Sequence, residues 1–168
     1  EKGGKQFEFA PAELPADLET YKFVSRKDKL IRKGNAEPAI KGFNLSGVTD
    51  IDSTSFILDE PYVLILFCEN FSVLVSKWEK EFSAIYSEAV AKNIPAYMVT
   101  TQPAKAEENL AGKTFSSIPI FKCDYTAIRT AARTNPCLYI LQKGTILGKW
   151  SRYKFHAAEK VLDKIPNR

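Results

Sequence analysis

Three cysteines, Cys68, Cys123 and Cys137, are the residues of this chain best suited to redox or nucleophilic chemistry. No two of them form a Cys-x-x-Cys pair, and an odd number of thiols excludes a fully paired set of disulfides within one chain. The cysteine spacing carries no zinc signature, and with His156 as the only histidine a multi-histidine metal site is impossible. We therefore expect neither a metal nor a cofactor.

Cys68 ends an uninterrupted apolar stretch that starts at Tyr62, which is typical of a strand covered by helices on both faces. From Phe71 to about Lys92 the apolar residues recur at steps of three and four, which predicts a long amphipathic helix. Between the two elements lie Glu69 and Asn70, and Ser72 follows. These polar residues could bind a small ligand through backbone N–H groups at the helix start.

The remaining elements alternate in type along the chain. We expect a short helix ending near Leu58 and capped by Thr49 or Asp50. Further strands are predicted at 96–100, 118–123, 138–141 and 145–150, and further helices at 103–111, 125–133 and 157–165. This alternation, which ends in a hairpin and a helix, predicts an α/β layered domain with a mixed central β-sheet flanked by helices.

Residues 1–33 differ in character from residues 34–168. A glycine- and proline-containing start is followed by two short apolar runs within residues 20–31, separated by a polar cluster, which predicts a β-hairpin. We thus expect an N-terminal hairpin extension that packs on an edge of the main domain.

Composition excludes several classes of function. With 45% hydrophobic and 26% charged residues in 168, and no run of roughly 18 apolar residues, the chain predicts a globular domain without a membrane helix. The net charge of +4 is spread among acidic residues, and the densest basic stretch, 143–154, is interpreted as a solvated surface. We expect no nucleic-acid partner.

Residues 34–168 resemble a thioredoxin-like domain of the TlpA and peroxiredoxin branch. The opening pattern runs from Gly34 through Pro38 to Phe43-x-Leu45, and Asn135-Pro136 precedes the strand and turn at 137–144. The resemblance implies that Pro136 is a cis-proline at the active-site position, with a backbone edge free to pair with an extended peptide.

Two short strings are also similar to the soluble tail of DoxX-type membrane proteins. They are Arg133-Thr134-Asn135-Pro136 and Gly148-Lys149-Trp150. This resemblance implies a periplasmic or otherwise extracytoplasmic domain that is tethered to a membrane part in the full-length protein. Because Glu1 is not an initiator methionine, we expect a leader or membrane-bound portion to have been removed.

The departures from the thioredoxin pattern concern the residues that carry its reaction. Ser72 stands where the family has its nucleophilic cysteine, Val75 replaces the resolving cysteine, and Leu66 replaces a buried acid. A serine hydroxyl has no thiolate form near neutral pH and cannot enter thiol–disulfide exchange. The dithiol reaction is not expected.

Two functions remain open. The first is a non-catalytic binding domain whose groove for a peptide or protein partner is formed by Pro136 and Asn135, together with Ser72, Phe71, Asn70 and Glu69. The alternative is a thiol–disulfide oxidoreductase that uses Cys137, because this residue borders the implied groove and a nearby helix N-terminus would lower a thiol pKa. Cys68 could lie near Cys137 and form a redox pair with it.

Overall fold

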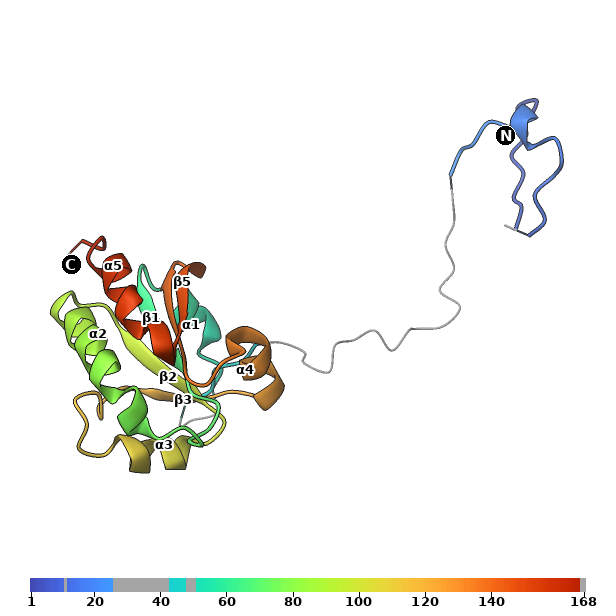
Figure 1. Ribbon diagram of the computed structural model, residues 1–168. Coiled ribbons are helices and arrows are strands. Elements are labelled where there is room, and N and C mark those ends of the chain that lie inside the picture. Colours follow the sequence, from blue (N-terminus) through green and yellow to red (C-terminus); the bar gives the residue numbers. More distant parts are fainter. Residues whose placement is uncertain (11, 26–42, 48–50, 167–168) are drawn as a thin grey trace. The chain divides into compact units, whose positions relative to one another are not determined.

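A five-stranded mixed sheet organises the larger part of the chain in the computed structural model, which describes residues 1–10, 12–25, 43–47 and 51–166. The chain divides into an N-terminal unit, Glu1–Glu37, and a main unit, Pro38–Arg168 (Figure 1). The strands are β1 (Val63–Phe67), β2 (Ala96–Thr100), β3 (Ile120–Lys122), β4 (Cys137–Gln142) and β5 (Thr145–Ser151).

The strand order is β3-β2-β1-β4-β5. β1, β2 and β3 run parallel, whereas β4 is antiparallel to both β1 and β5. All five residues of β1 and of β2 are buried, as the unbroken apolar runs predict for strands in the middle of a covered sheet. Lys143 and Gly144, both with positive φ, form the tight turn between β4 and β5.

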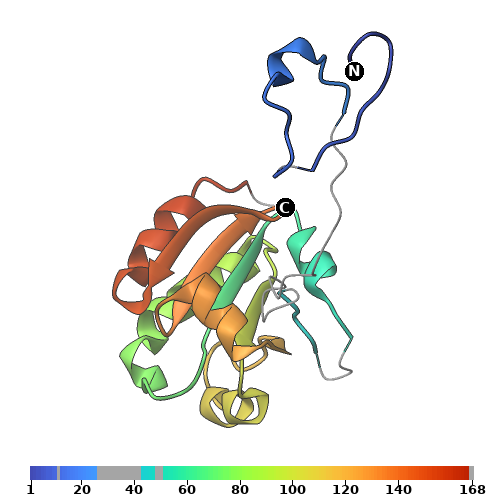
Figure 2. The ribbon, with the colours of Figure 1, turned by 90° about the vertical axis from the view of Figure 1, so that its right-hand side faces the viewer.

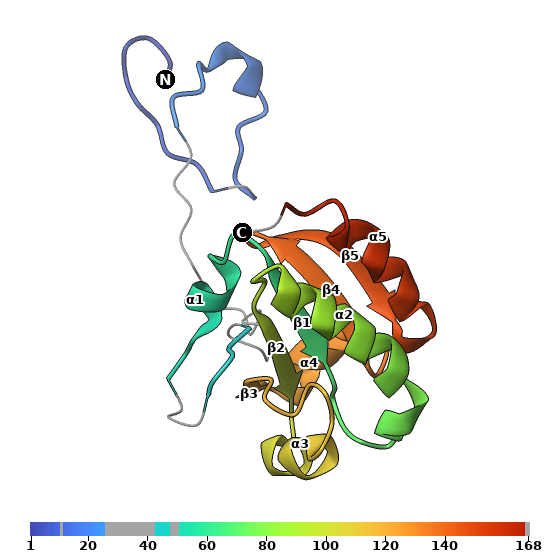
Figure 3. The ribbon, with the colours of Figure 1, turned by 90° about the vertical axis from the view of Figure 1, so that its left-hand side faces the viewer.

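Helices cover both faces of the sheet. They are α1 (Thr54–Leu58), α2 (Glu79–Ala91), α3 (Pro103–Leu110), α4 (Tyr125–Ala132) and α5 (Glu159–Leu162), with 3-10 turns η2 (Val75–Lys77) and η3 (Arg152–Ala158). α2, α3, η3 and α5 bury their apolar side chains in one core cluster, and α1 and α4 bury theirs in the other. The ribbon views show helices on both faces of the sheet (Figure 2 and Figure 3). The predicted α/β architecture with a mixed central sheet is confirmed.

The start of the long helix differs from the prediction. α2 begins at Glu79, after η2, so that residues 68–74 form a loop instead of the first turns of a helix from Phe71. Trp78 is fully buried and its ring stacks on Phe115 at 5.7 Å between ring centroids. Phe71, Val75 and Trp78 pack on the core without forming a continuous helix, whereas Leu74 is exposed. Burial at this spacing therefore does not require helical backbone.

Two further boundaries are refined. α1 begins at Thr54, whose backbone N–H donates to the side chain of Asp52, while the predicted caps Thr49 and Asp50 lie outside the described residues. The last predicted helix is a 3-10 segment followed by the short α5. Among the described residues, no helix has the length and apolar character needed to cross a bilayer.

The N-terminal unit has an aromatic cluster of its own. The rings of Phe7 and Phe9 both meet the Tyr21 ring edge-on, and Lys2 forms an ion pair with Asp17 at 2.6 Å. The predicted hairpin is not found in the described part of this unit: a 3-10 turn, η1, spans Leu18–Thr20, and residues 22–25 carry no strand. Its expected second strand, near residues 30 and 31, lies outside the described residues.

Candidate functional site

The loop between α4 and β4 contains the residues that the thioredoxin resemblance places at the site. Asp124 begins α4 by accepting hydrogen bonds from the backbone N–H groups of Thr126 and Ala127, and Arg133 ends it in the left-handed conformation. The following peptide bond between Asn135 and Pro136 is cis, and Pro136 is buried.

The loop after β1 forms the opposite wall of the site. The side-chain oxygen of Asn70 accepts a hydrogen bond from the backbone N–H of Ser72 at 3.0 Å, and the side-chain amide of Asn70 donates to Glu69 Oε1 at 3.0 Å. Thr101, which follows β2, donates its hydroxyl to the backbone oxygen of Glu69 at 2.7 Å. These bonds hold the polar residues of the loop in one arrangement.

Asn135 connects the two loops. Its side-chain amide donates to the backbone oxygen of Asn70 at 2.8 Å and to the side-chain oxygen of Asn70 at 3.1 Å. The side-chain oxygen of Asn135 is buried and has no hydrogen-bond partner among the described residues. The structure therefore brings together four predicted site residues, namely Glu69, Asn70, Asn135 and the adjoining Pro136.

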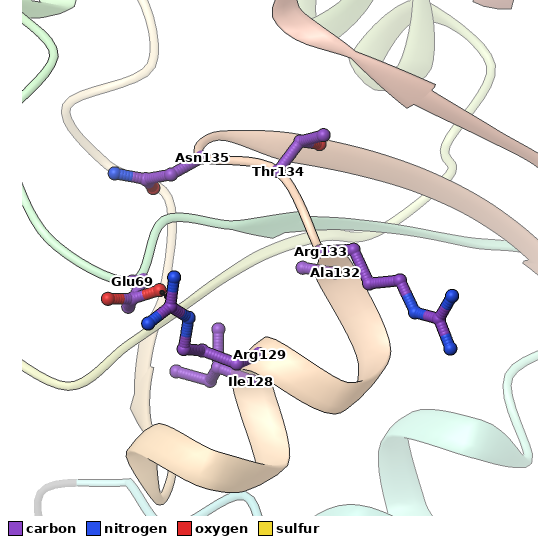
Figure 4. A pocket seen from close by; sticks show the side chains of 7 residues that line it. All are labelled: Glu69, Ile128, Arg129, Ala132, Arg133, Thr134 and Asn135. Carbon is purple, nitrogen blue, oxygen red and sulfur yellow. Dashed lines mark ion pairs between the residues drawn. The ribbon is translucent and has the colours of Figure 1, made fainter.

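A small pocket of about 70 Å³ lies between these loops and α4. It is lined by Glu69, Ile128, Arg129, Ala132, Arg133, Thr134 and Asn135 (Figure 4). Arg129 places its Nε 3.4 Å from Glu69 Oε2, and its guanidinium also bonds the hydroxyl of Tyr125. The arginines were not among the sequence candidates. Arg129 and Arg133 stand four residues apart shortly before the Asn-Pro pair, a spacing that places both on one side of a helix near its end.

Two predicted site residues lie elsewhere. Phe71 is half-buried and packs against the core cluster beneath α2, whereas Ser72 is exposed. The predicted helix start beside Ser72 is wrong, because α2 begins only at Glu79, and the Ser72 N–H donates to Asn70. Orphan N–H groups of a helix N-terminus are thus not found there.

Cys68 and Cys137 lie on opposite faces of the sheet. Phe67 pairs directly with Cys137 across β1 and β4, so that Phe67 and Cys137 share one apolar cluster while Cys68, the next residue, belongs to the other. Successive side chains of an extended strand point to opposite faces, which places the sheet between the two thiols. All three cysteines are free and buried. The expected closeness of Cys68 and Cys137 in a redox pair is therefore wrong.

The cysteine environments disfavour thiolates. Burial raises the pKa of the Cys68 thiol to about 12, with a further contribution from the Glu69 carboxylate, and burial raises the pKa of Cys123 to about 11. Burial also raises the pKa of Cys137, against the smaller lowering effects of a hydrogen bond with Thr134 and of the Lys149 charge. The expected lowering of the Cys137 pKa is thus reversed, because desolvation outweighs the favourable neighbours.

The described residues contain no group of three or more His, Cys, Asp or Glu side chains that could hold a metal ion. The polar atoms at the pocket instead come mainly from one carboxylate, one amide and two arginines. Such a set offers hydrogen-bond donors and charge for recognising a ligand, and it contains no thiol.

Comparison with solved structures identifies the fold. Yeast Sco1 matches with a TM-score of 0.51 and 16% identity over 78% of this chain and 99% of that chain. A thiol:disulfide interchange protein from Bacteroides sp. matches with a TM-score of 0.52 and 13% identity, covering 72% of this chain and 86% of that one. The exposed lipoprotein thioredoxin Etrx1 of Streptococcus pneumoniae matches with a TM-score of 0.52 and 15% identity, covering 73% and 98%.

These structural likenesses show that the main unit has a thioredoxin-like fold. A family profile described as a domain of unknown function, DUF8463, matches residues 1–33. No curated protein matches the chain. At identities this low the solved structures establish the fold alone.

Proposed function

We propose that the main unit is a non-catalytic thioredoxin-like domain that binds an extended peptide or protein segment at the pocket beside Asn135. The observation that carries the proposal is the combination of an accessible pocket without sulfur and three thiols buried in the core. Thiol–disulfide exchange needs an exposed thiolate, whereas recognition of a peptide needs only open backbone groups and a shaped surface.

The backbone of Asn135 supplies such open groups. Neither its N–H nor its C=O has a backbone partner among the described residues, although the ladder between β1 and β4 begins only two residues later, at Cys137. Unpaired backbone groups next to a strand can form main-chain hydrogen bonds with an added extended segment. The contact between Asn135 and Asn70 holds this part of the loop in place without using those groups.

Insulin reduction in the presence of dithiothreitol separates binding from catalysis. We expect the rate with this protein to equal the uncatalysed rate, and we expect peptides from a random extended library to shift the amide NMR signals of Thr134 and Asn135. Turnover above background would refute the non-catalytic part of the proposal. A library that leaves those signals unchanged would refute the binding part.

An oxidoreductase that uses Cys137 is the second candidate. It is favoured by the hydrogen bond with Thr134 and by the Lys149 charge, both of which lower the Cys137 pKa. The discriminating variant is Cys137→Ala: loss of an insulin-reducing activity in this variant, with activity kept in Cys123→Ala, would establish this candidate instead.

We also propose that the chain is an extracytoplasmic domain of a membrane-associated protein. The support is the pair of strings at residues 133–136 and 148–150, which are similar to the soluble tail of DoxX-type proteins. Expression of the complete gene product followed by membrane fractionation tests this: we expect it in the membrane fraction, with this domain cleaved by protease added to intact spheroplasts. Release into the soluble cytoplasmic fraction would contradict it.

A further inference from the structure

Arg129 is an exposed charged group of the pocket. Its side chain is 61% exposed, while that of its partner Glu69 is 15% exposed. Figure 4 shows the Arg129 guanidinium beside Glu69, and the Arg133 guanidinium extending away from them beyond the end of α4. The cation that a ligand at this pocket would meet is therefore that of Arg129.

The contacts of Arg129 leave part of its guanidinium available. An arginine has five N–H donors in a planar fork. Here the Nε group faces Glu69, and one Nη1 donor bonds the hydroxyl of Tyr125. These two contacts orient the fork, and its remaining donors have no partner among the described residues. A planar donor set of this kind fits a carboxylate better than a neutral carbonyl.

The neighbouring charges permit an anion. Glu69 accepts a hydrogen bond from the side-chain amide of Asn70. Its single negative charge neutralises one of the two arginines that line the pocket, Arg129 and Arg133, and leaves the other positive charge unbalanced. The carbonyl groups at the end of α4 would repel an anion, but the Ala131 oxygen already accepts bonds from the Lys149 ammonium, at 2.6 Å, and from the Tyr139 hydroxyl. The electrostatic opposition from the helix end is thereby reduced.

The size of the pocket admits a small polar group. Its volume of about 70 Å³ is several times the roughly 10–15 Å³ that one water molecule needs on the same measure. A carboxylate group is small enough to enter such a space. Asn135 lines the same space.

We propose that the pocket binds a carboxylate carried by an extended peptide, with the guanidinium of Arg129 as the partner of that carboxylate. This inference rests on the proposed peptide-binding function and names its ligand class. The carboxylate can come from an acidic side chain within the peptide or from its C-terminus, since both present the same two oxygens.

Titration of the full chain with three matched peptides tests the inference. The first contains one internal Glu and has both ends blocked, the second has Gln in its place, and the third has Gln and a free C-terminus. We expect a carboxylate-bearing peptide to bind roughly tenfold more tightly than the blocked Gln peptide at low salt, with the preference falling as salt is added. Whichever carboxylate gives the larger preference identifies the source.

Variants assign the effect to the guanidinium. Arg129→Gln should abolish the preference, Arg129→Lys should keep part of it, and Arg133→Gln should weaken it only slightly. The matched control is Lys160→Gln, which removes one exposed positive charge on α5 and should leave the preference unchanged. Because Arg129 is largely exposed, its replacement should leave the dispersion of the NMR spectrum intact.

Each other outcome is decisive. Equal binding of the Glu, free-C-terminus and blocked Gln peptides would overturn the inference and leave the peptide-binding function standing. A preference that survives in Arg129→Gln would overturn the role of Arg129. If none of the three peptides shifts the signals of Thr134 or Asn135, the inference fails, and failure of a wider peptide library at the same signals would remove the proposed function with it.

Discussion

Asn135 donates its side-chain amide twice to Asn70, at 2.8 Å to the backbone oxygen and at 3.1 Å to the side-chain oxygen. The two residues are 65 positions apart in the chain. One side chain therefore holds the loop before β4 against the loop after β1, and the pocket lies where these loops meet α4 (Figure 4).

Replacement of Asn135 by alanine should weaken this connection. The variant loses both hydrogen bonds, which destabilises the fold. It also loses the buried side-chain oxygen that has no partner, and this partly offsets the destabilisation. We therefore expect the free energy of unfolding to fall by about 1 kcal/mol. Urea denaturation followed by circular dichroism measures the change. Asn109→Ala is the control, because the Asn109 amide makes one exposed bond within α3 and alanine favours helix there. Equal loss in the two variants would contradict the role of Asn135.

The three thiols should react slowly with iodoacetamide in the folded protein. Because only thiolates react and burial raises all three pKa values, we expect native alkylation at pH 8 to be at least about 100-fold slower than alkylation of the chain unfolded in guanidinium chloride. Mass spectrometry of timed samples gives the rates. One thiol modified at the unfolded rate, Cys137 above all, would show that it is accessible and would favour the oxidoreductase candidate.

The same pKa shifts predict an alkaline loss of stability. The unfolded chain releases its thiol protons as the pH passes the ordinary thiol pKa of 9.0, whereas the folded chain retains them until a higher pH. The folded state therefore binds more protons in this window, and the free energy of unfolding should fall as the pH rises above about 9. Cys68→Ala should reduce this slope, and an unchanged slope in that variant would count against the raised Cys68 pKa.

Glu88 should affect stability in the acid range. Burial raises the pKa of this carboxyl, and the charges of Asp163 and Glu159 and a hydrogen bond with Asp163 act in the same direction, against Lys92. The protonated carboxyl contributes fully to the free energy of unfolding when the pH is below its ordinary pKa of 4.5. This stabilising contribution is lost as the pH rises through the raised pKa of the folded state.

Glu88→Gln removes the charge that these neighbours disfavour. We expect the variant to unfold at a higher urea concentration than the parent at pH 7, with the difference shrinking as the pH falls toward 4.5. Glu81→Gln, at an exposed position of the same helix, is the control and should show no such pH-dependent gain. A Glu88→Gln difference that is constant with pH would rule out the proposed titration.

Gly148 leaves space for the ring of Trp150. A Cβ atom at position 148 would lie 2.1 Å from Cη2 of that ring, which itself packs against the core cluster. Gly148→Ala should displace the ring and lower the free energy of unfolding by about 1–3 kcal/mol, with a changed near-ultraviolet circular dichroism signal. Gly47→Ala is the control, since its Cβ would lie an ordinary 3.6 Å from the Phe121 ring. Comparable spectra and stability for the two variants would contradict this packing account.

Local patterns in the sequence were sufficient to predict most of the strands and helices. The unbroken apolar runs predicted the central strands β1 and β2, and Pro103 and Gly112 correctly bracketed α3. The absence of a Cys-x-x-Cys pair is likewise a property of the residues themselves and needs no coordinates. The start of α2 was mispredicted, because the half-buried Phe71 and the buried Trp78 pack on the core at the spacing that a helix would also give.

The site depended on contacts that no local pattern contains. Arg129 meets Glu69 from 60 positions further along the chain, and the pairing of β1 with β4 places Cys68 and Cys137 on opposite faces of the sheet. The sequence by itself determined which chemical groups exist and which segments extend or coil, because both follow from residue type and from neighbours in the chain. Only the tertiary structure decided which groups meet and which thiols lose contact with water, because pairing and burial arise from residues distant in sequence.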